Sequence, residues 1–236
     1  MNFNRNSFYD YPLWVQWSVA LLLLLCFLIA CLGVVALILE DPLWALLTPL
    51  LIPVSQFTVS PLFTLLGLYR YLSPILHIYL PNRKSYELHH ASSFDYLFLW
   101  QQLKHCPDRK RQILMYYLEG LINLIKLIEE KNVSPDVVIE GNTYFINKRT
   151  SQLIGLSLTR TGKFKKACLY LNFLDMLWMY SFTCKKLQLP SLSHSGYLKG
   201  NGHQLVANKH KLLGLYRRLK SANTEAVAVN GSAGFS

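Results

Sequence analysis

A histidine and an aspartate lie close together in the stretch ELHHASSFDYLFL, which spans residues 87–99. His90 and Asp95 are separated by four residues, where a short extended run gives way to a helical pattern. An imidazole can take a proton from a hydroxyl group, and a carboxylate beside it can hold the ring in the tautomer that this step requires. The spacing therefore makes His90 a candidate general base and Asp95 its orienting acid.

A second group of polar residues follows the β-rich run Asp136–Glu140 (DVVIE). Gly141 closes that run, and Asn142, Lys148 and Arg149 precede the next helical pattern. Backbone amides at a helix N-terminus, together with nearby bases, can hold a phosphate or a lipid headgroup. The segment lacks the glycines of a phosphate-binding loop, so an ordinary strand-to-helix connection is the alternative.

Taken together, the two motifs resemble those of the glycerolipid acyltransferases, in which a His and an Asp five positions later open a helix and an apolar strand ends in Glu-Gly. His90 and Asp95 match the first motif. Glu140 and Gly141 match the end of the second, although Asn142 stands where the family has a threonine. The resemblance implies that His90 deprotonates an acceptor hydroxyl and that Asp95 orients the imidazole. It also implies that Glu140 and Gly141 bind the phosphate of the acceptor.

The first motif also fits a purely structural role. Ser92 or Ser93 can cap a helix that begins here, with Asp95 in its positively polarised first turn. His89 and His90 would then be polar residues near a membrane interface. The sequence leaves both interpretations open.

Two long uncharged runs near the N-terminus indicate a membrane anchor. The chain has 236 residues, of which 52% are hydrophobic and only 16% are charged. Residues 11–39 and 42–69 contain no charge, and only Glu40 and Asp41 separate them. Each run exceeds the roughly 20 residues that a helix needs to cross a hydrocarbon layer about 30 Å thick. We therefore expect a transmembrane helical hairpin.

The first run has other interpretations. A cleaved signal peptide has an apolar core of only about 7–15 residues. A lipoprotein signal would end at Cys31, but apolar residues continue to Leu39. The run is also long for a buried helix of a soluble protein. We favour an uncleaved anchor with Trp14 and Trp17 at one membrane interface.

Prolines interrupt the second run at Pro49, Pro53 and Pro61. Each proline removes a backbone donor and bends a helix. A kinked anchor is the simpler explanation, and a broken helix in a transport or channel complex is the alternative. The following segment, Tyr71–Pro81, is too short to cross a membrane and is expected to lie in the interface.

The rest of the chain is strongly basic. The net charge is +11, and 22 of the 24 Lys and Arg residues follow Pro81. The positive-inside rule then places both termini in the cytoplasm and the acidic turn outside, as in a multi-pass membrane protein. Basic side chains near a cytoplasmic leaflet attract anionic lipid. We therefore expect membrane lipids, and a second membrane protein, as partners.

Other partners are not expected from the sequence. There is no signature of a nucleic-acid-binding fold, so the basic character does not indicate nucleic acid. The five cysteines are scattered without the spacing of a disulfide framework or a zinc site. We expect no metal and no cofactor.

The segment from Lys163 to Lys186 combines an apolar centre with basic ends. Residues 167–184 are mostly apolar, with Asn172 and Asp175 in the middle. A charged residue at the centre of a bilayer costs about 2.5–3.5 kcal/mol, so we expect one helix that packs on the domain or on the membrane surface. A third membrane span is the alternative. The lysines expected at the membrane surface are Lys163, Lys165, Lys166, Lys185 and Lys186.

Hydrophobic periodicity outlines the remaining elements. Apolar residues three and four positions apart predict a long helix from Pro107 to about Lys131. The runs Tyr86–His89 and Asp136–Glu140 are strand candidates, which would pair in a small sheet because an isolated strand cannot satisfy its backbone groups. Thr150–Leu158 and His203–Leu219 predict two further helices.

These patterns predict an integral membrane protein of mainly α class. Its N-terminal two-helix transmembrane hairpin would be followed by a mostly helical cytoplasmic domain with at most a small β-sheet. We expect the hairpin and interfacial segment at 1–81, the basic domain at 82–190, a linker and amphipathic helix at 191–220, and a disordered tail at 221–236. The expected function is binding of anionic headgroups, a partner membrane protein, or both. Acyl transfer by His90 and Asp95 and a part in a transport complex are the alternatives.

Overall fold

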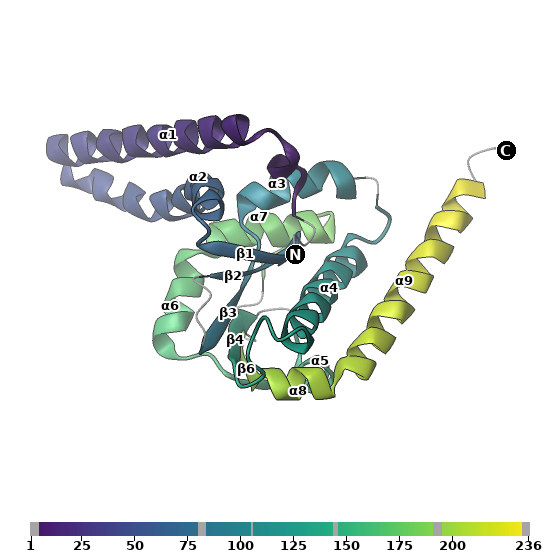
Figure 1. Ribbon diagram of the computed structural model, residues 1–236. Helices are drawn as coiled ribbons and strands as arrows, with labels where there is room; N and C mark the ends of the chain where they lie inside the picture. Colours follow the sequence, from purple (N-terminus) through teal and green to yellow (C-terminus); the bar gives the residue numbers. More distant parts are fainter. Residues whose placement is uncertain (1–4, 80–83, 105, 144–145, 191–194, 233–236) are drawn as a thin grey trace.

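The computed structural model describes residues 5–79, 84–104, 106–143, 146–190 and 195–232, with side chains described as far as Ser221. The protein is mostly helical and contains one mixed sheet (Figure 1). In chain order the elements are η1 (Ser7–Asp10), α1 (Leu13–Glu40), η2 (Pro42–Leu50), α2 (Leu51–Leu65), β1 (Tyr69–Ser73), β2 (Leu76–Tyr79), β3 (Ser85–His90), α3 (Ser93–Leu103), α4 (Arg109–Glu129), β4 (Val138–Thr143), α5 (Lys148–Leu153), β5 (Ser157–Arg160), α6 (Lys163–Leu171), α7 (Phe173–Cys184), β6 (Gly196–Asn201), α8 (Gly202–Ala207) and α9 (Lys209–Ser232).

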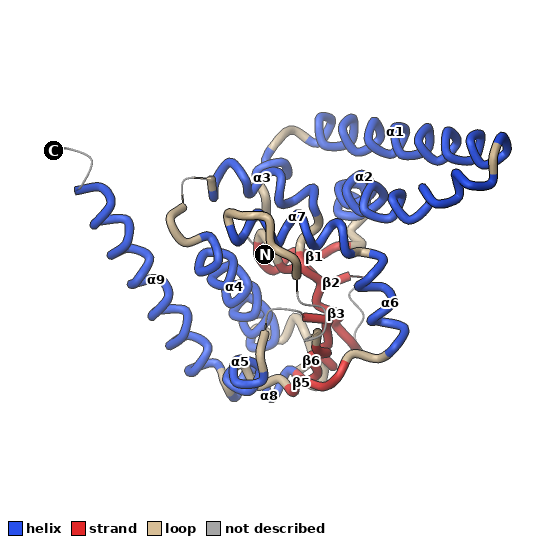
Figure 2. Tube along the Cα trace, turned by 180° about the vertical axis from the view of Figure 1, so that it is seen from behind, coloured by secondary structure: helices blue, strands red, loops and turns tan. Residues whose placement is uncertain are grey.

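Helices α1 and α2 form an antiparallel hairpin that projects from the rest of the protein (Figures 1 and 2). Helix α1 and the stretch Pro42–Leu65 are each long and apolar enough to cross a membrane. The 3-10 helix η2 contains Pro49, and α2 continues through Pro61 without a break. The chain therefore has the two apolar helices that the sequence predicts.

The base of the hairpin is fixed to the domain by the segment that precedes α1. Phe8 and Tyr9 pack against Tyr71 of β1 and Phe94 of α3 in a buried aromatic cluster. The Tyr9 hydroxyl also donates to Thr64 Oγ1 at the end of α2, over 2.9 Å. These contacts hold both ends of the hairpin against the sheet.

The sheet has six strands in the order β1-β2-β3-β4-β6-β5. All neighbours are antiparallel except β3 and β4, which are parallel. The two predicted strands are present and pair with each other, Tyr86 opposite Ile139. The second begins at Val138 instead of Asp136 and continues through Gly141 to Thr143. The sheet is larger than predicted because four further strands join them.

Two of those strands lie where the sequence predicts a segment in the membrane interface, at residues 71–81. Tyr71–Ser73 belong to β1 and Leu76–Tyr79 form β2, and most of these residues are buried in the protein. Leu80 and Pro81 lie outside the described residues. Strand β2 pairs with β3, a partner that the local pattern of the segment cannot reveal. Likewise β6 occupies Gly196–Asn201, which the sequence suggested as a linker, because β4 and β5 flank it.

One face of the sheet carries the hydrophobic core. Ile78, Leu88 and Ile139 are almost completely buried, and α4 packs on this face with Leu118, Leu121 and Leu124. A Cβ atom on Gly120 of α4 would lie 2.7 Å from Leu76 Cδ2, so the absence of a side chain there permits the close approach. The predicted long helix is thus confirmed as the helix under the sheet.

Three predicted helices differ from the observed ones. The segment Lys163–Lys186 forms two helices, α6 and α7, which meet at Asn172, and each is too short to cross a bilayer. The predicted helix Thr150–Leu158 is shorter, because α5 ends at Leu153 and the chain enters β5. At the C-terminus α9 runs on to Ser232, beyond the expected end at Leu219 and through most of the tail at 221–236 that the sequence predicts to be disordered.

Candidate functional site

The face of the sheet opposite α4 carries polar and aromatic side chains. Successive residues of a strand point to opposite faces, and paired residues of neighbouring strands share a face. Because Ile78, Leu88 and Ile139 point into the core, their neighbours along the strands point away from it. The polar face therefore includes Tyr69, Tyr71, His77, Tyr79, Glu87, His89, Glu140, Asn142, Tyr197 and Lys199.

A cavity of about 650 Å³ lies between this face and the helices α2, α6 and α7. Its size falls within the range of about 300–1,000 Å³ that is typical of small-molecule sites. Gln56 of α2 donates to Asn172 Oδ1, at the junction of α6 and α7, over 2.6 Å. Asp175 of α7 also lines the cavity and accepts a hydrogen bond from Ser93. These contacts join the helices that enclose the space.

Two histidines of the polar face line the cavity. The rings of His77 and His89 stack with their centroids 5.9 Å apart, and the Tyr69 ring lies 4.4 Å from that of His77. His77 is 3% exposed, and its Nδ1 has no hydrogen-bond partner among the residues that the structure describes. Burial, reinforced by His89 and His90, lowers the pKa of His77 well below its usual value. The His77 imidazole is therefore neutral at physiological pH.

Charged groups gather on the same face near α6. Glu87 Oε2 lies 3.5 Å from His89 Nε2, and this contact with His89 lowers the pKa of Glu87. The Lys165 ammonium sits 3.7 Å above the centre of the Tyr197 ring. The Tyr197 hydroxyl in turn donates to Glu140 Oε2. Charges of both signs thus meet at this part of the sheet.

Asp95 joins three separate parts of the chain. Its Oδ1 accepts hydrogen bonds from Asn6 Nδ2 (2.5 Å) and from the Tyr71 hydroxyl (2.7 Å). Its Oδ2 accepts from the backbone N–H and the hydroxyl of Ser92, both over 3.0 Å. Asp95 is completely buried, and burial raises its pKa to about 6 against the opposing effect of these hydrogen bonds. Ser92 and Asp95 form the capping box of α3, so the predicted capping role is confirmed.

His90 lies at the end of β3 and borders the cavity, but its position in the register is that of a core residue. It is paired with Leu76 and follows Leu88 on the same face. Its Nε2 lies 3.5 Å from the Tyr96 hydroxyl, and burial lowers the pKa of His90 to about 4. Since Asn6, Tyr71 and Ser92 occupy both oxygens of the Asp95 carboxylate, a catalytic His90–Asp95 pair stays a prediction without support from this geometry.

The five residues suggested for phosphate binding do not converge on one site. Asn142 lines the cavity, whereas Glu140 accepts from Tyr197. Gly141 faces the core, where a Cβ atom would lie 2.7 Å from the Leu88 carbonyl oxygen. Lys148 and Arg149 are exposed in the first turn of α5 and lie outside the cavity lining.

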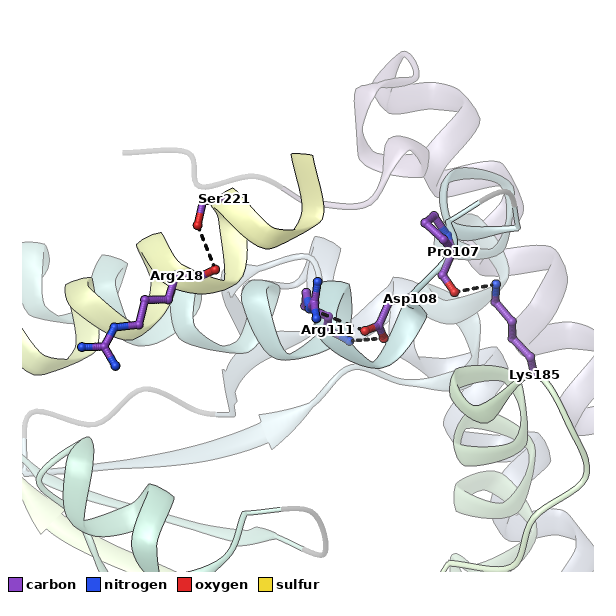
Figure 3. Close-up of polar contacts among 6 residues, drawn as sticks. All are labelled: Pro107, Asp108, Arg111, Lys185, Arg218 and Ser221. Atoms are coloured by element: carbon purple, nitrogen blue, oxygen red, sulfur yellow. Dashed lines mark hydrogen bonds and ion pairs between the residues drawn. The ribbon is translucent and has the colours of Figure 1, made fainter. Parts of the chain in front are cut away.

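The lysines predicted at the membrane surface have two kinds of environment. Lys163, Lys185 and Lys186 are exposed, whereas Lys165 and Lys166 are partly buried and Lys165 points towards Tyr197. Lys185 donates to the Pro107 carbonyl oxygen over 2.9 Å and so ties the end of α7 to the start of α4 (Figure 3). Their contact with a membrane stays a prediction.

Sequence reasoning missed the cavity and the central place of His77 in it. The signal was present in β1 and β2, where aromatic or histidine side chains alternate with other residues at the period of a strand. Among the described residues, no three His, Cys, Asp or Glu side chains are grouped so that they could hold a metal ion. Comparison of the chain with models of protein families, with curated proteins and with solved structures gives no match.

Proposed function

We propose that this protein is a membrane-anchored protein whose basic domain rests on the cytoplasmic surface of the membrane and binds anionic lipid headgroups there. The observation that supports this proposal is a set of exposed apolar side chains on two helices, α6 and α7, which meet at Asn172. Phe164, Ala167 and Leu171 recur at intervals of three and four positions on α6, and Leu174 and Trp178 are four positions apart on α7. We call these five residues the α6–α7 stripe.

The position of the α6–α7 stripe favours contact with lipid. Helix α6 lies at the edge of the domain on the side towards which the hairpin projects (Figures 1 and 2). Leu174 and Trp178 line a shallow pocket together with Pro53 and Phe57 of α2. Phe164, at the far end of the stripe, is 81% exposed. The transfer of such exposed apolar side chains from water into the interfacial region of a bilayer is favourable.

Basic residues next to the stripe explain the preference for anionic headgroups. Lys163 and Lys166 lie at the start of α6, and Lys185 and Lys186 follow α7. Each Lys near an anionic leaflet contributes about 1 kcal/mol of attraction. Since Asn6 and Asp95 hold the N-terminal segment against the domain, both lie on one side of the membrane when the hairpin is inserted. Binding to a partner membrane protein and a part in a transport complex are the alternatives, and no contact among the described residues favours either of them.

The proposal can be tested by measuring the depth of α6 in nanodiscs. A nitroxide label is attached at Phe164→Cys in a chain whose five native cysteines are replaced by serine. We expect the label to be more accessible to oxygen dissolved in lipid than to a water-soluble nickel chelate, and more so when anionic lipid is present. A label at Ser157→Cys, exposed on β5, is the matched control and should stay in water. Equal exposure to water at both positions in both kinds of nanodisc would refute the proposal.

A further inference from the structure

The cavity between the polar face, α2, α6 and α7 contains a buried group that no described residue satisfies. His77 lines this cavity, and its Nδ1 lacks a hydrogen-bond partner in the described part of the chain. An unsatisfied buried polar group costs about 1–3 kcal/mol. The Nδ1 atom itself has almost no accessible surface, so a ligand oxygen would reach it only when the imidazole turns about its Cβ–Cγ bond, and the hydrogen bond formed in this way would stabilise the folded protein.

We propose that the cavity binds an uncharged long-chain lipid, such as a monoacylglycerol, through a hydroxyl or ester oxygen on His77. The proposal rests on the membrane anchoring proposed above, because the hairpin helix α2 contributes Gln56, Ser60 and Phe63 to the cavity wall. A lipid that enters along α2 would reach His77 without crossing the aqueous phase.

The charges around the cavity argue for an uncharged headgroup. Glu87 and Asp175 line it, and their carboxylates disfavour an anionic ligand. The one lysine in the lining, Lys165, already lies over the Tyr197 ring and interacts with Glu87. Burial lowers the pKa of His77, so its ring adds no positive charge but can still accept from a hydroxyl or donate to a carbonyl.

The rest of the lining suits a flexible hydrocarbon chain. Phe63, Leu169, Met176 and Met179 supply an apolar surface on the helical side of the cavity. Methionine side chains adapt to irregular shapes because they are unbranched and polarisable. The polar strand face and the apolar helix face together therefore match a molecule with a small polar head and one chain.

Cys168 provides a reporter of occupancy because it lines the cavity and is a free thiol. The full-length protein in detergent micelles is treated with N-ethylmaleimide, and alkylation is followed for each cysteine by peptide mass spectrometry. We expect monooleoylglycerol to slow the alkylation of Cys168 about tenfold, which corresponds to about 1.4 kcal/mol. Cys184, which lies at the end of α7 outside the lining, should react at an unchanged rate.

Two variants connect the protection to His77 and to the cavity. His77→Phe keeps a ring of similar size but removes both nitrogens, and we expect it to abolish the protection of Cys168. His203→Phe, at an exposed histidine of α8, should keep the protection. If His77→Phe does not fold, Leu169→Trp fills the cavity from α6 and should prevent protection in the same way.

The alternatives give different results. Equal protection by monooleoylglycerol, oleate and oleoyl lysophosphatidate would overturn the preference for an uncharged head. Unchanged protection in the His77→Phe and Leu169→Trp variants would overturn the site, as would the lack of any protection, which would indicate a water-filled cavity. Because micelles that contain monooleoylglycerol carry no anionic lipid, protection of Cys168 by this lipid does not depend on whether α6 binds anionic headgroups.

Discussion

The two faces of the six-stranded sheet come from the same strands but bury different chemistry. One face is formed by aliphatic residues such as Ile78 and Ile139 and packs against α4. The other carries histidines, tyrosines and carboxylates and borders a cavity under α2, α6 and α7. Strand geometry makes this contrast possible, since adjacent residues point to opposite faces. We infer that stability resides mainly in the first face and ligand binding in the second.

The largest expected effect on the free energy of unfolding comes from the apolar face, and two neighbouring residues of β4 test it. Ile139→Ala removes methyl groups from a completely buried position, and we expect a loss of about 2–5 kcal/mol in the free energy of unfolding. Its neighbour Glu140 belongs to the polar face, so Glu140→Gln should change the free energy by less than about 0.5 kcal/mol. Chemical denaturation of both variants in detergent measures the difference. Similar losses would contradict the assignment of stability to one face.

The next largest effect concerns Asp95, which lies where the aromatic cluster meets the edge of the sheet. Asp95→Asn replaces one carboxylate oxygen, which accepts hydrogen bonds, with an amide nitrogen, which can only donate. At least one of the donors Asn6, Tyr71 and Ser92 then loses its acceptor, and we expect a loss of about 1–3 kcal/mol in the free energy of unfolding at pH 7. Asp108→Asn is the matched control, since Asp108 caps α4 on the surface. It should cost only a few tenths of a kcal/mol, on the order of an exposed surface change.

The cost of Asp95→Asn should also depend on pH. The folded-state pKa of Asp95 is about 6, above the unfolded value of about 3.9. The contribution of Asp95 to stability is therefore greatest below about pH 4 and is lost as the pH rises through 6. Asparagine does not titrate, so the measured cost should be larger at pH 4.5 than at pH 7.5. A cost that rises with pH would show that the buried carboxylate is stabilised in its charged form.

A smaller effect on stability is expected from the contact between Lys165 and Tyr197 on the polar face. Lys165→Met keeps the aliphatic part of the side chain but removes the ammonium above the Tyr197 ring. We expect a loss of about 0.5–1 kcal/mol, the usual contribution of a cation–π contact at an exposed site. Lys163→Met, at an exposed position on the same helix, should have no measurable effect on unfolding. Equal effects would mean that the contact with Tyr197 does not contribute.

The smallest effect at neutral pH is expected for His77→Phe. Phenylalanine removes an imidazole nitrogen that lacks a partner, so little stability should be lost at pH 7.5. The pKa of His77 is lowered in the folded state, so the wild-type protein loses stability as the pH falls below the unfolded value of about 6.5. The variant avoids that loss and should become relatively more stable towards pH 5. Met179→Leu, another change in the cavity lining, should show no such trend.

Features that depend on neighbouring residues could be predicted from the sequence. The capping box of Ser92 and Asp95, the helix under the sheet and the two strands β3 and β4 all follow from patterns of a few consecutive residues. The same local patterns gave too little information for β1, β2 and β6. Their strand character depends on partners far away in the chain, as in the pairing of Asn142 with Tyr197.

The candidate site was harder to predict than the fold. The sequence drew attention to His90 and Asp95 because of their spacing, but spacing does not determine which face a residue occupies. The register places His90 with Leu76 on the core face, while Asn6 and Tyr71 bond to Asp95. His77 became a candidate only when the strands and α6–α7 were brought together around it.

The sequence by itself determined the two apolar helices, because the length of an uncharged run and the charges that flank it are properties of consecutive residues. It also determined the basic character of the part that follows them. Only the tertiary structure decided which polar residues share a space. That depends on strand order and register, and a shift of one residue would move every side chain to the other face. His77 and His89 lie together in the cavity because β2 and β3 pair in the register that sets these two residues opposite each other.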